Sequence, residues 1–162
     1  MAANENAQSA EAAQPPGPDP ALKRLEKLVG TWEATGRTLD SDEDNVSGRL
    51  AFEWLPGGFF LQQRVELNFM GFDIAALEVI GYDPATDTFP STVYSSLVGD
   101  PLAYRYEAEG NDFTIRTEFG GGATFTGTFS EDGNTLSGGW RPDEGKAGPG
   151  NVAYDIRGTR VS

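Results

Sequence analysis

Turn signals recur along most of the chain, and the segments between them are short. The signals include PGG, YDPATD, EGND, FGGG and EDGN, which are rich in the Gly, Asn, Asp and Pro residues that tight turns require. After Gly30 no segment repeats its apolar residues with the period of a helix. The segments between the turns are therefore predicted to be short β-strands.

We predict ten strands with short connections, so that strands adjacent in sequence pair as hairpins. Their expected bounds are 30–38, 48–55, 58–69, 72–81, 87–96, 101–108, 112–119, 122–130, 135–141 and 151–161. An open meander of this size would leave long unpaired edges, and closure removes them. The sequence therefore predicts an all-β fold, an up-and-down antiparallel β-barrel.

The N-terminal region follows a different pattern. Residues 1–18 contain no large apolar residue after Met1 and are predicted to be a flexible tail. The following segment, DPALKRLEKLVG, has Asp19 as an N-cap, Pro20 at the first helical position and Gly30 where a helix would stop. One short amphipathic helix is expected here, with an apolar face formed by Leu22, Leu25, Leu28 and Val29. Residues 19–162 are expected to form a single domain.

Composition excludes several classes of function. The chain has 25 acidic and 12 basic residues, a net charge of −13 that opposes binding to nucleic acid or to anionic membranes. It has no Cys and no His, so thiol chemistry, disulfides and the usual zinc ligand sets are absent. No apolar run is long enough to span a bilayer, and the N-terminus does not resemble a secretion signal. We expect a soluble, cytoplasmic protein that needs no cofactor.

The acidic stretch DSDEDN, residues 40–45, resembles the start of a calcium loop. Asn45 stands where such a loop needs glycine, and Ala51 stands where it needs a bidentate glutamate. We therefore interpret the stretch as a solvated hairpin loop and expect no metal site.

Aromatic residues occupy alternate positions in several predicted strands, and these faces are expected to point into the barrel. Phenols there would offer apolar area together with a hydroxyl group that needs a partner. Trp54 is expected at the cavity floor, with Tyr104 and Phe125 higher on the wall. The candidate ligand-binding residues are Phe52, Trp54, Tyr104, Tyr106, Phe113, Phe125, Trp140 and Tyr154.

Two strands leave alternatives open. Gln62, Arg64 and Glu66 share one face of their strand, which is either the solvated outer face or a polar site inside the barrel. The segment FDIAALEVIGY is apolar on both faces, so its outer face must be covered by the helix or by a second subunit. We expect the second alternative for this segment, a homodimer.

The first strand and the chain end carry a resemblance. GTW after a short helix, together with DIRGTRV at the end of the meander, resembles the calycin superfamily of lipocalins and fatty-acid-binding proteins. LVGTW, WLPGGFFLQQ and IGYDPATDTF are similar to the DUF1579 family, bacterial lipocalin-like proteins of unknown function, over roughly residues 22–161. The resemblance implies that Trp32 packs across the closed end of the barrel under a last-strand arginine. Arg160 fits this role better than Arg157, because Arg160 shares a face with Tyr154 and Ile156.

Another resemblance is to the ten-stranded haem-binding barrels similar to nitrobindin, which hold iron through a histidine. Because this chain has no histidine, haem binding through that ligand is excluded.

Three functions remain in view. The first is a non-enzymatic binder of a small hydrophobic or aromatic molecule in the barrel cavity. The second is a cofactor-independent enzyme, a cyclase or isomerase, in which a Tyr, Glu or Arg handles one proton of a hydrophobic intermediate. The third is a barrel filled by its own side chains that serves as an interaction module. A ligand would enter at the end opposite Trp32, between the turns near 36–48, 68–72, 95–101 and 119–122.

Overall fold

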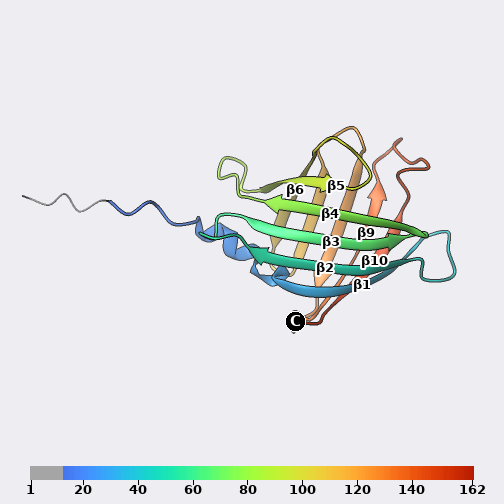
Figure 1. The fold of residues 1–162 in the computed structure, drawn as a ribbon, viewed down its shortest axis with the longest axis horizontal. Helices are drawn as coiled ribbons and strands as arrows, with labels where there is room; N and C mark the ends of the chain where they lie inside the picture. Colours follow the sequence, from blue (N-terminus) through green and yellow to red (C-terminus); the bar gives the residue numbers. More distant parts are fainter. Residues whose placement is uncertain (1–12) are drawn as a thin grey trace, which may run out of the picture.

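Ten antiparallel strands close into a single barrel in the computed structural model, which describes residues 13–162 (Figure 1). The strands are β1 (Gly30–Thr38), β2 (Val46–Trp54), β3 (Leu61–Phe69), β4 (Phe72–Ile80), β5 (Phe89–Ser95), β6 (Leu102–Glu109), β7 (Asp112–Thr117), β8 (Ala123–Phe129), β9 (Thr135–Pro142) and β10 (Tyr154–Arg160). Each strand pairs with its neighbours in sequence, and β1 pairs with β10 to complete the ring. The predicted fold class is confirmed, and the strand ends differ from the expected ones by only a few residues.

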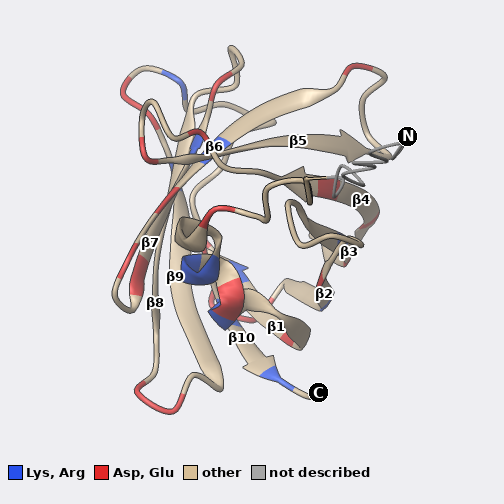
Figure 2. Ribbon diagram, turned by 90° about the vertical axis from the view of Figure 1, so that its left-hand side faces the viewer, with Lys and Arg blue, Asp and Glu red and all other residues tan. Residues whose placement is uncertain are grey.

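The expected helix is a 3₁₀ helix, η1 (Pro20–Leu28). It begins where the Asp19 side chain accepts a hydrogen bond from the amide of Ala21 at 2.9 Å. A 3₁₀ helix has about three residues per turn, so Leu22, Leu25 and Leu28 align along one side, and all three are buried. Figure 2 views the barrel from the end that η1 covers. Residues 1–12 of the predicted tail lie outside the described residues, and residues 13–19 are exposed without helix or strand.

Trp32 and Arg160 pack against each other at this end of the barrel, as the resemblance implied. The Trp32 side chain is 1% exposed, and its indole N–H donates to the carbonyl of Leu28 at 2.8 Å. The guanidinium carbon of Arg160 lies 4.2 Å from the centre of the indole ring, a cation–π contact. Arg160 also donates to the carbonyls of Lys27 at 2.7 Å and Gly133 at 3.2 Å. One side chain therefore connects β1, η1 and the β8–β9 turn.

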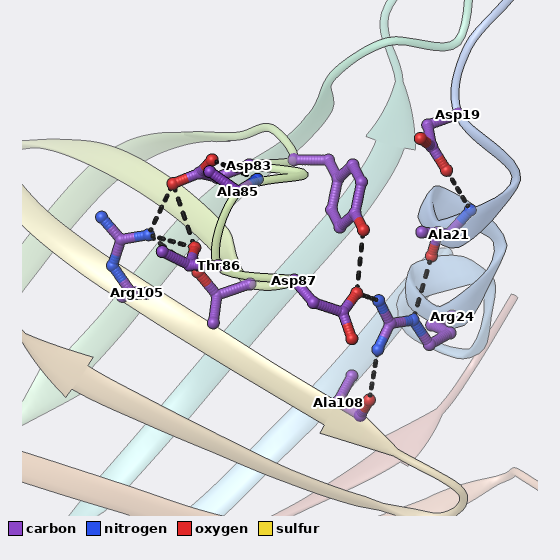
Figure 3. Close-up of polar contacts among 11 residues, drawn as sticks. Asp19, Ala21, Arg24, Asp83, Ala85, Thr86, Asp87, Arg105 and Ala108 are labelled. Atoms are coloured by element: carbon purple, nitrogen blue, oxygen red, sulfur yellow. Dashed lines mark hydrogen bonds and ion pairs between the residues drawn. The ribbon is translucent and has the colours of Figure 1, made fainter.

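The segment YDPATD, part of the family resemblance, folds into the loop between β4 and β5 and contacts η1 through Arg24 (Figure 3). Arg24 of η1 forms an ion pair with Asp87 and donates to the carbonyl of Ala108 at 3.2 Å. The Tyr82 hydroxyl donates to the same Asp87 carboxylate at 2.8 Å. Arg24 also lies 4.9 Å from the centre of the Phe89 ring. The helix is therefore held to the barrel end by polar contacts around its buried leucines.

Replacing Trp32 by alanine tests the closed end. The substitution Trp32→Ala should lower the free energy of unfolding by about 3–5 kcal/mol, as for other buried large aromatics, because it also removes the ring that Arg160 covers. Urea denaturation followed by circular dichroism measures this change. Deleting residues 1–18 should leave the free energy of unfolding almost unchanged, and a loss as large as that of the Trp32 variant would contradict the boundary at Asp19.

Candidate ligand-binding site

A cavity of about 630 Å³ occupies the interior of the barrel. Its lining runs from Leu28 and Trp32 at the closed end to Phe72, Leu97 and Val98 at the other end. Two of these residues are highly exposed, Phe72 at 71% and Leu97 at 62%. The mouth of the cavity is therefore opposite η1, as expected, and its rim is apolar.

The mouth differs from the predicted one in a single turn. The turns near 68–72, 95–101 and 119–122 contribute lining residues, as predicted. Within the described residues, the turn over residues 36–48 contributes no lining residue. Residues 149–152, between β9 and β10, line the mouth in its place. The β1–β2 loop is tied to its own strands, because the Asn45 side chain hydrogen-bonds the amide of Thr38 at 2.9 Å and Arg37 pairs with Asp44 at 3.1 Å.

Most of the candidate ligand-binding residues line the cavity. They are Phe52, Tyr104, Tyr106, Phe113, Phe125, Trp140 and Tyr154. Trp54 does not belong to this set: it lies at the closed end as expected, but its indole N–H donates to the Glu26 carboxylate of η1 at 2.7 Å. The physical reason is that β2 ends at Trp54, where the ring meets the helix rather than the cavity.

Aromatic rings form a continuous wall across β6 to β9. The ring centres of Phe113 and Phe125 are 5.3 Å apart, those of Phe125 and Trp140 are 5.6 Å apart, and those of Tyr104 and Trp140 are 6.0 Å apart. These separations are typical of tilted and edge-to-face aromatic pairs. Glycine makes room for the wall, because a Cβ atom at Gly138 would lie 2.5 Å from the Phe125 ring.

One carboxyl group faces this apolar interior. Glu78 on β4 is 4% exposed and lines the cavity. Its Oε1 accepts a hydrogen bond from the Tyr106 hydroxyl at 2.6 Å, and its Oε2 accepts one from the Ser91 hydroxyl at 2.6 Å. Gln63, its partner in the β3–β4 register, is also buried and lines the cavity. The sequence has therefore placed a small polar cluster inside an aromatic barrel.

The pKa values of this cluster are shifted by burial. Desolvation raises the pKa of Glu78 and outweighs the opposing effect of the hydrogen bonds from Ser91 and Tyr106. Burial, followed by the nearby Glu78 charge, raises the pKa of Tyr104 to about 12 and that of Tyr106 well above its ordinary value. Both phenols therefore stay protonated at neutral pH, and Tyr106 donates its proton in the hydrogen bond to Glu78.

Sequence reasoning missed Glu78, Gln63 and Ser91. Glu78 is the one polar residue on the β4 face that carries Ile74, Ala76 and Ile80, and this break in an apolar face was the available signal. The alternatives for β3 are also resolved: Arg64 and Glu66 are exposed, and the inner face carries Gln63.

Within residues 13–162, Glu78 is the only acidic residue among those that line the cavity, and no Lys or Arg lines it. The described part of the chain contains no group of three or more Asp or Glu side chains placed to hold a metal ion. No helix among residues 13–162 is long and apolar enough to cross a membrane.

Comparisons with known proteins agree with this architecture. A family model described as a protein of unknown function (DUF1579) matches residues 17–129. The structure is similar to the crystal structure of Rv2717c from M. tuberculosis, with a TM-score of 0.56 and 12% sequence identity over 90% of this chain and 99% of that chain. At this identity the likeness concerns the fold alone. No curated protein matches the chain.

The burial of Glu78 predicts a pH-dependent stability difference. Because the folded-state pKa is raised, the folded protein binds more protons than the unfolded chain between the two pKa values, so this carboxyl lowers stability as the pH rises through that window. Relative to wild type, Glu78→Gln should therefore gain stability from about pH 4 toward neutrality, as measured by urea denaturation. Glu66→Gln, which removes an exposed carboxyl of β3, is the matched control. A pH-independent difference for Glu78→Gln would contradict the buried placement.

Proposed function

The chain belongs to the DUF1579 family of unknown function, and we propose that it binds a small hydrophobic or aromatic molecule inside the barrel without transforming it. The observation that carries this proposal is the apolar cavity of about 630 Å³ with an open mouth. Small-molecule sites in proteins typically have volumes of roughly 300–1,000 Å³ and few polar groups. A barrel filled by its own side chains would not leave such a space, so the cavity disfavours the interaction-module alternative.

Contact with aromatic rings would provide most of the affinity. A ligand that enters the cavity would meet Phe113, Phe125 and Trp140 along the wall. Burial of apolar surface contributes about 25 cal/mol per Å², whereas one neutral hydrogen bond contributes about 1 kcal/mol. Shape and apolar area would therefore decide which molecules bind tightly, and the polar cluster at Glu78 would orient them.

The Glu78 cluster also supports a second candidate, a cofactor-independent enzyme. A buried carboxyl with a raised pKa can accept and return a proton within the cavity, and Tyr106 beside it can donate a hydrogen bond to developing charge. An isomerase or cyclase needs little more than such a group in an apolar cavity. This candidate predicts that a bound molecule is converted by wild type, and that Glu78→Gln retains binding but loses conversion.

Native mass spectrometry of the purified protein, followed by solvent extraction, tests ligand binding directly. A co-purifying small molecule supports the proposal. If the extracted molecule is unchanged after incubation with fresh protein, the protein is a binder, and if it is converted, the protein is an enzyme.

A homodimer is a further proposal, supported by the outer face of β4. Leu77 and Val79 are only partly buried there, and Tyr94, opposite Leu77 in the register, is 53% exposed. The helix η1 packs across the barrel end, with its main strand contacts on β6. Sedimentation equilibrium at micromolar concentration should give a dimer, and Leu77→Glu should shift it toward monomer. A wild-type protein that is only monomeric would contradict the proposal.

A neutral fluorescent dye tests where a ligand sits. N-phenyl-1-naphthylamine should bind in the cavity and quench tryptophan emission, because Trp32 and Trp140 line the space. Tyr104→Ala should weaken the dye by about fivefold or more through loss of a ring contact, as measured by fluorescence titration. Arg64→Ala is the control, because Arg64 is exposed on the outer face of β3. The reverse ranking would place the dye outside the barrel and contradict the cavity site.

A further inference from the structure

We propose that the barrel cavity is selective for a lipophilic amine, whose ammonium group pairs with Glu78 near the cavity floor while its hydrocarbon part lies against the aromatic wall. This inference rests on the proposed ligand-binding function and gives it a chemical class. It excludes long-chain carboxylates as the preferred ligand.

Charge is the first argument. Among residues 13–162, no Lys or Arg lines the cavity, so no cation there would receive a ligand carboxylate. Glu78 is the one acidic side chain in the lining, and neither of its hydrogen-bond partners carries a positive charge. A second carboxylate beside Glu78 would face like charge in a desolvated site, which is strongly unfavourable. A protonated amine would supply the missing opposite charge.

Hydrogen-bonding capacity is the second argument. Tyr106 and Ser91 each donate one hydrogen bond, to Oε1 and Oε2 of Glu78 respectively. A carboxylate offers about four lone-pair sites, so each oxygen retains acceptor capacity. An ammonium group has three donors and no acceptor, which matches an acceptor that is already fixed in position. The two hydroxyl groups thus hold the carboxylate ready for a donor.

Position in the barrel is the third argument. Glu78 lies near the closed-end terminus of β4 at Ile80, whereas Phe72 at the start of the strand is on the exposed rim. The polar group is therefore deep, and the way to it passes apolar side chains. A ligand with one cationic head and a hydrocarbon tail fits this arrangement, with the head at the deep polar group and the tail along the apolar path to the mouth. Tyr104, opposite Ser91 in the β5–β6 register, also lines the cavity and adds an aromatic ring for the ammonium group.

Burial makes the pairing favourable. An unpaired carboxylate in this interior is costly, and the raised pKa of Glu78 expresses that cost. A bound ammonium group would offset it, because a buried charge is tolerated when it is paired and hydrogen-bonded. A neutral alcohol would accept or donate one hydrogen bond at the same place without this gain.

The test compares three ligands with the same hydrocarbon chain: decylamine, decan-1-ol and decanoate. Isothermal titration calorimetry on the full wild-type chain at neutral pH should show that decylamine binds about tenfold or more tightly than decan-1-ol, as expected for a charge-assisted hydrogen bond. Decanoate should bind more weakly than the alcohol. Displacement of N-phenyl-1-naphthylamine by each ligand places the binding in the cavity.

A variant pair assigns the selectivity to Glu78. In Glu78→Gln the advantage of decylamine over decan-1-ol should disappear, and decanoate should bind more tightly than it does to wild type. Glu66→Gln removes an exposed carboxylate from the outer face of β3 and should keep the wild-type order. Because the three-ligand comparison is made first within wild type, the test does not depend on whether the variant folds.

The outcomes separate this inference from the proposed function. Binding of the dye and decan-1-ol with no advantage for decylamine, or equal binding of decanoate, overturns the amine selectivity and leaves ligand binding intact. Failure of the dye and of all three ligands to bind overturns both.

Discussion

The stack of Arg160 on Trp32 is the contact on which the rest of the barrel depends. It joins the first and last strands at the point where the ring closes, and the same guanidinium holds the carbonyl of Lys27 in η1. With η1 fixed there, one end of the barrel is sealed by buried leucines and the other stays open. The cavity therefore follows from the way the barrel is closed at one end, and no ligand-binding motif in the sequence is needed to form it.

Much of this arrangement could be predicted from local sequence, because turn residues and alternation act over a few positions. Gly, Asn and Asp at the turns set the strands, and alternating aromatic residues placed Phe52, Phe113 and Phe125 inside. What failed depends on contacts between distant segments. The sequence predicts Trp54 at the cavity floor because it shares a face with Phe52 and lies toward the closed end, but no local pattern indicates that its indole N–H donates to Glu26 of the helix.

The Glu78 cluster is a feature of the candidate site that was not predicted from the sequence. A glutamate inside an otherwise apolar strand was overlooked because Ile74, Ala76 and Ile80 dominate its face. The donors that make its burial tolerable, Ser91 and Tyr106, come from β5 and β6. The pairing of β4 with β5 and of β5 with β6 brings these three residues together. A polar residue at an inward position of an apolar strand destabilises a fold unless its hydrogen-bonding groups are satisfied, and Ser91 and Tyr106 provide these hydrogen bonds to Glu78.

The register that pairs Trp32 with Arg160 also constrains how the chain reaches its native state. Every other strand pairing is between neighbours in sequence, and each can form as a local hairpin soon after its residues are available. The β1–β10 pairing instead joins segments separated by nearly the whole described chain, and its loop-closure entropy is the largest in the molecule. Until β10 is in place, β1 presents an open edge and η1 lacks the guanidinium that fixes it. The ring closes only when β1 meets β10, so before that contact forms the edge of β1 is open to pairing with another chain.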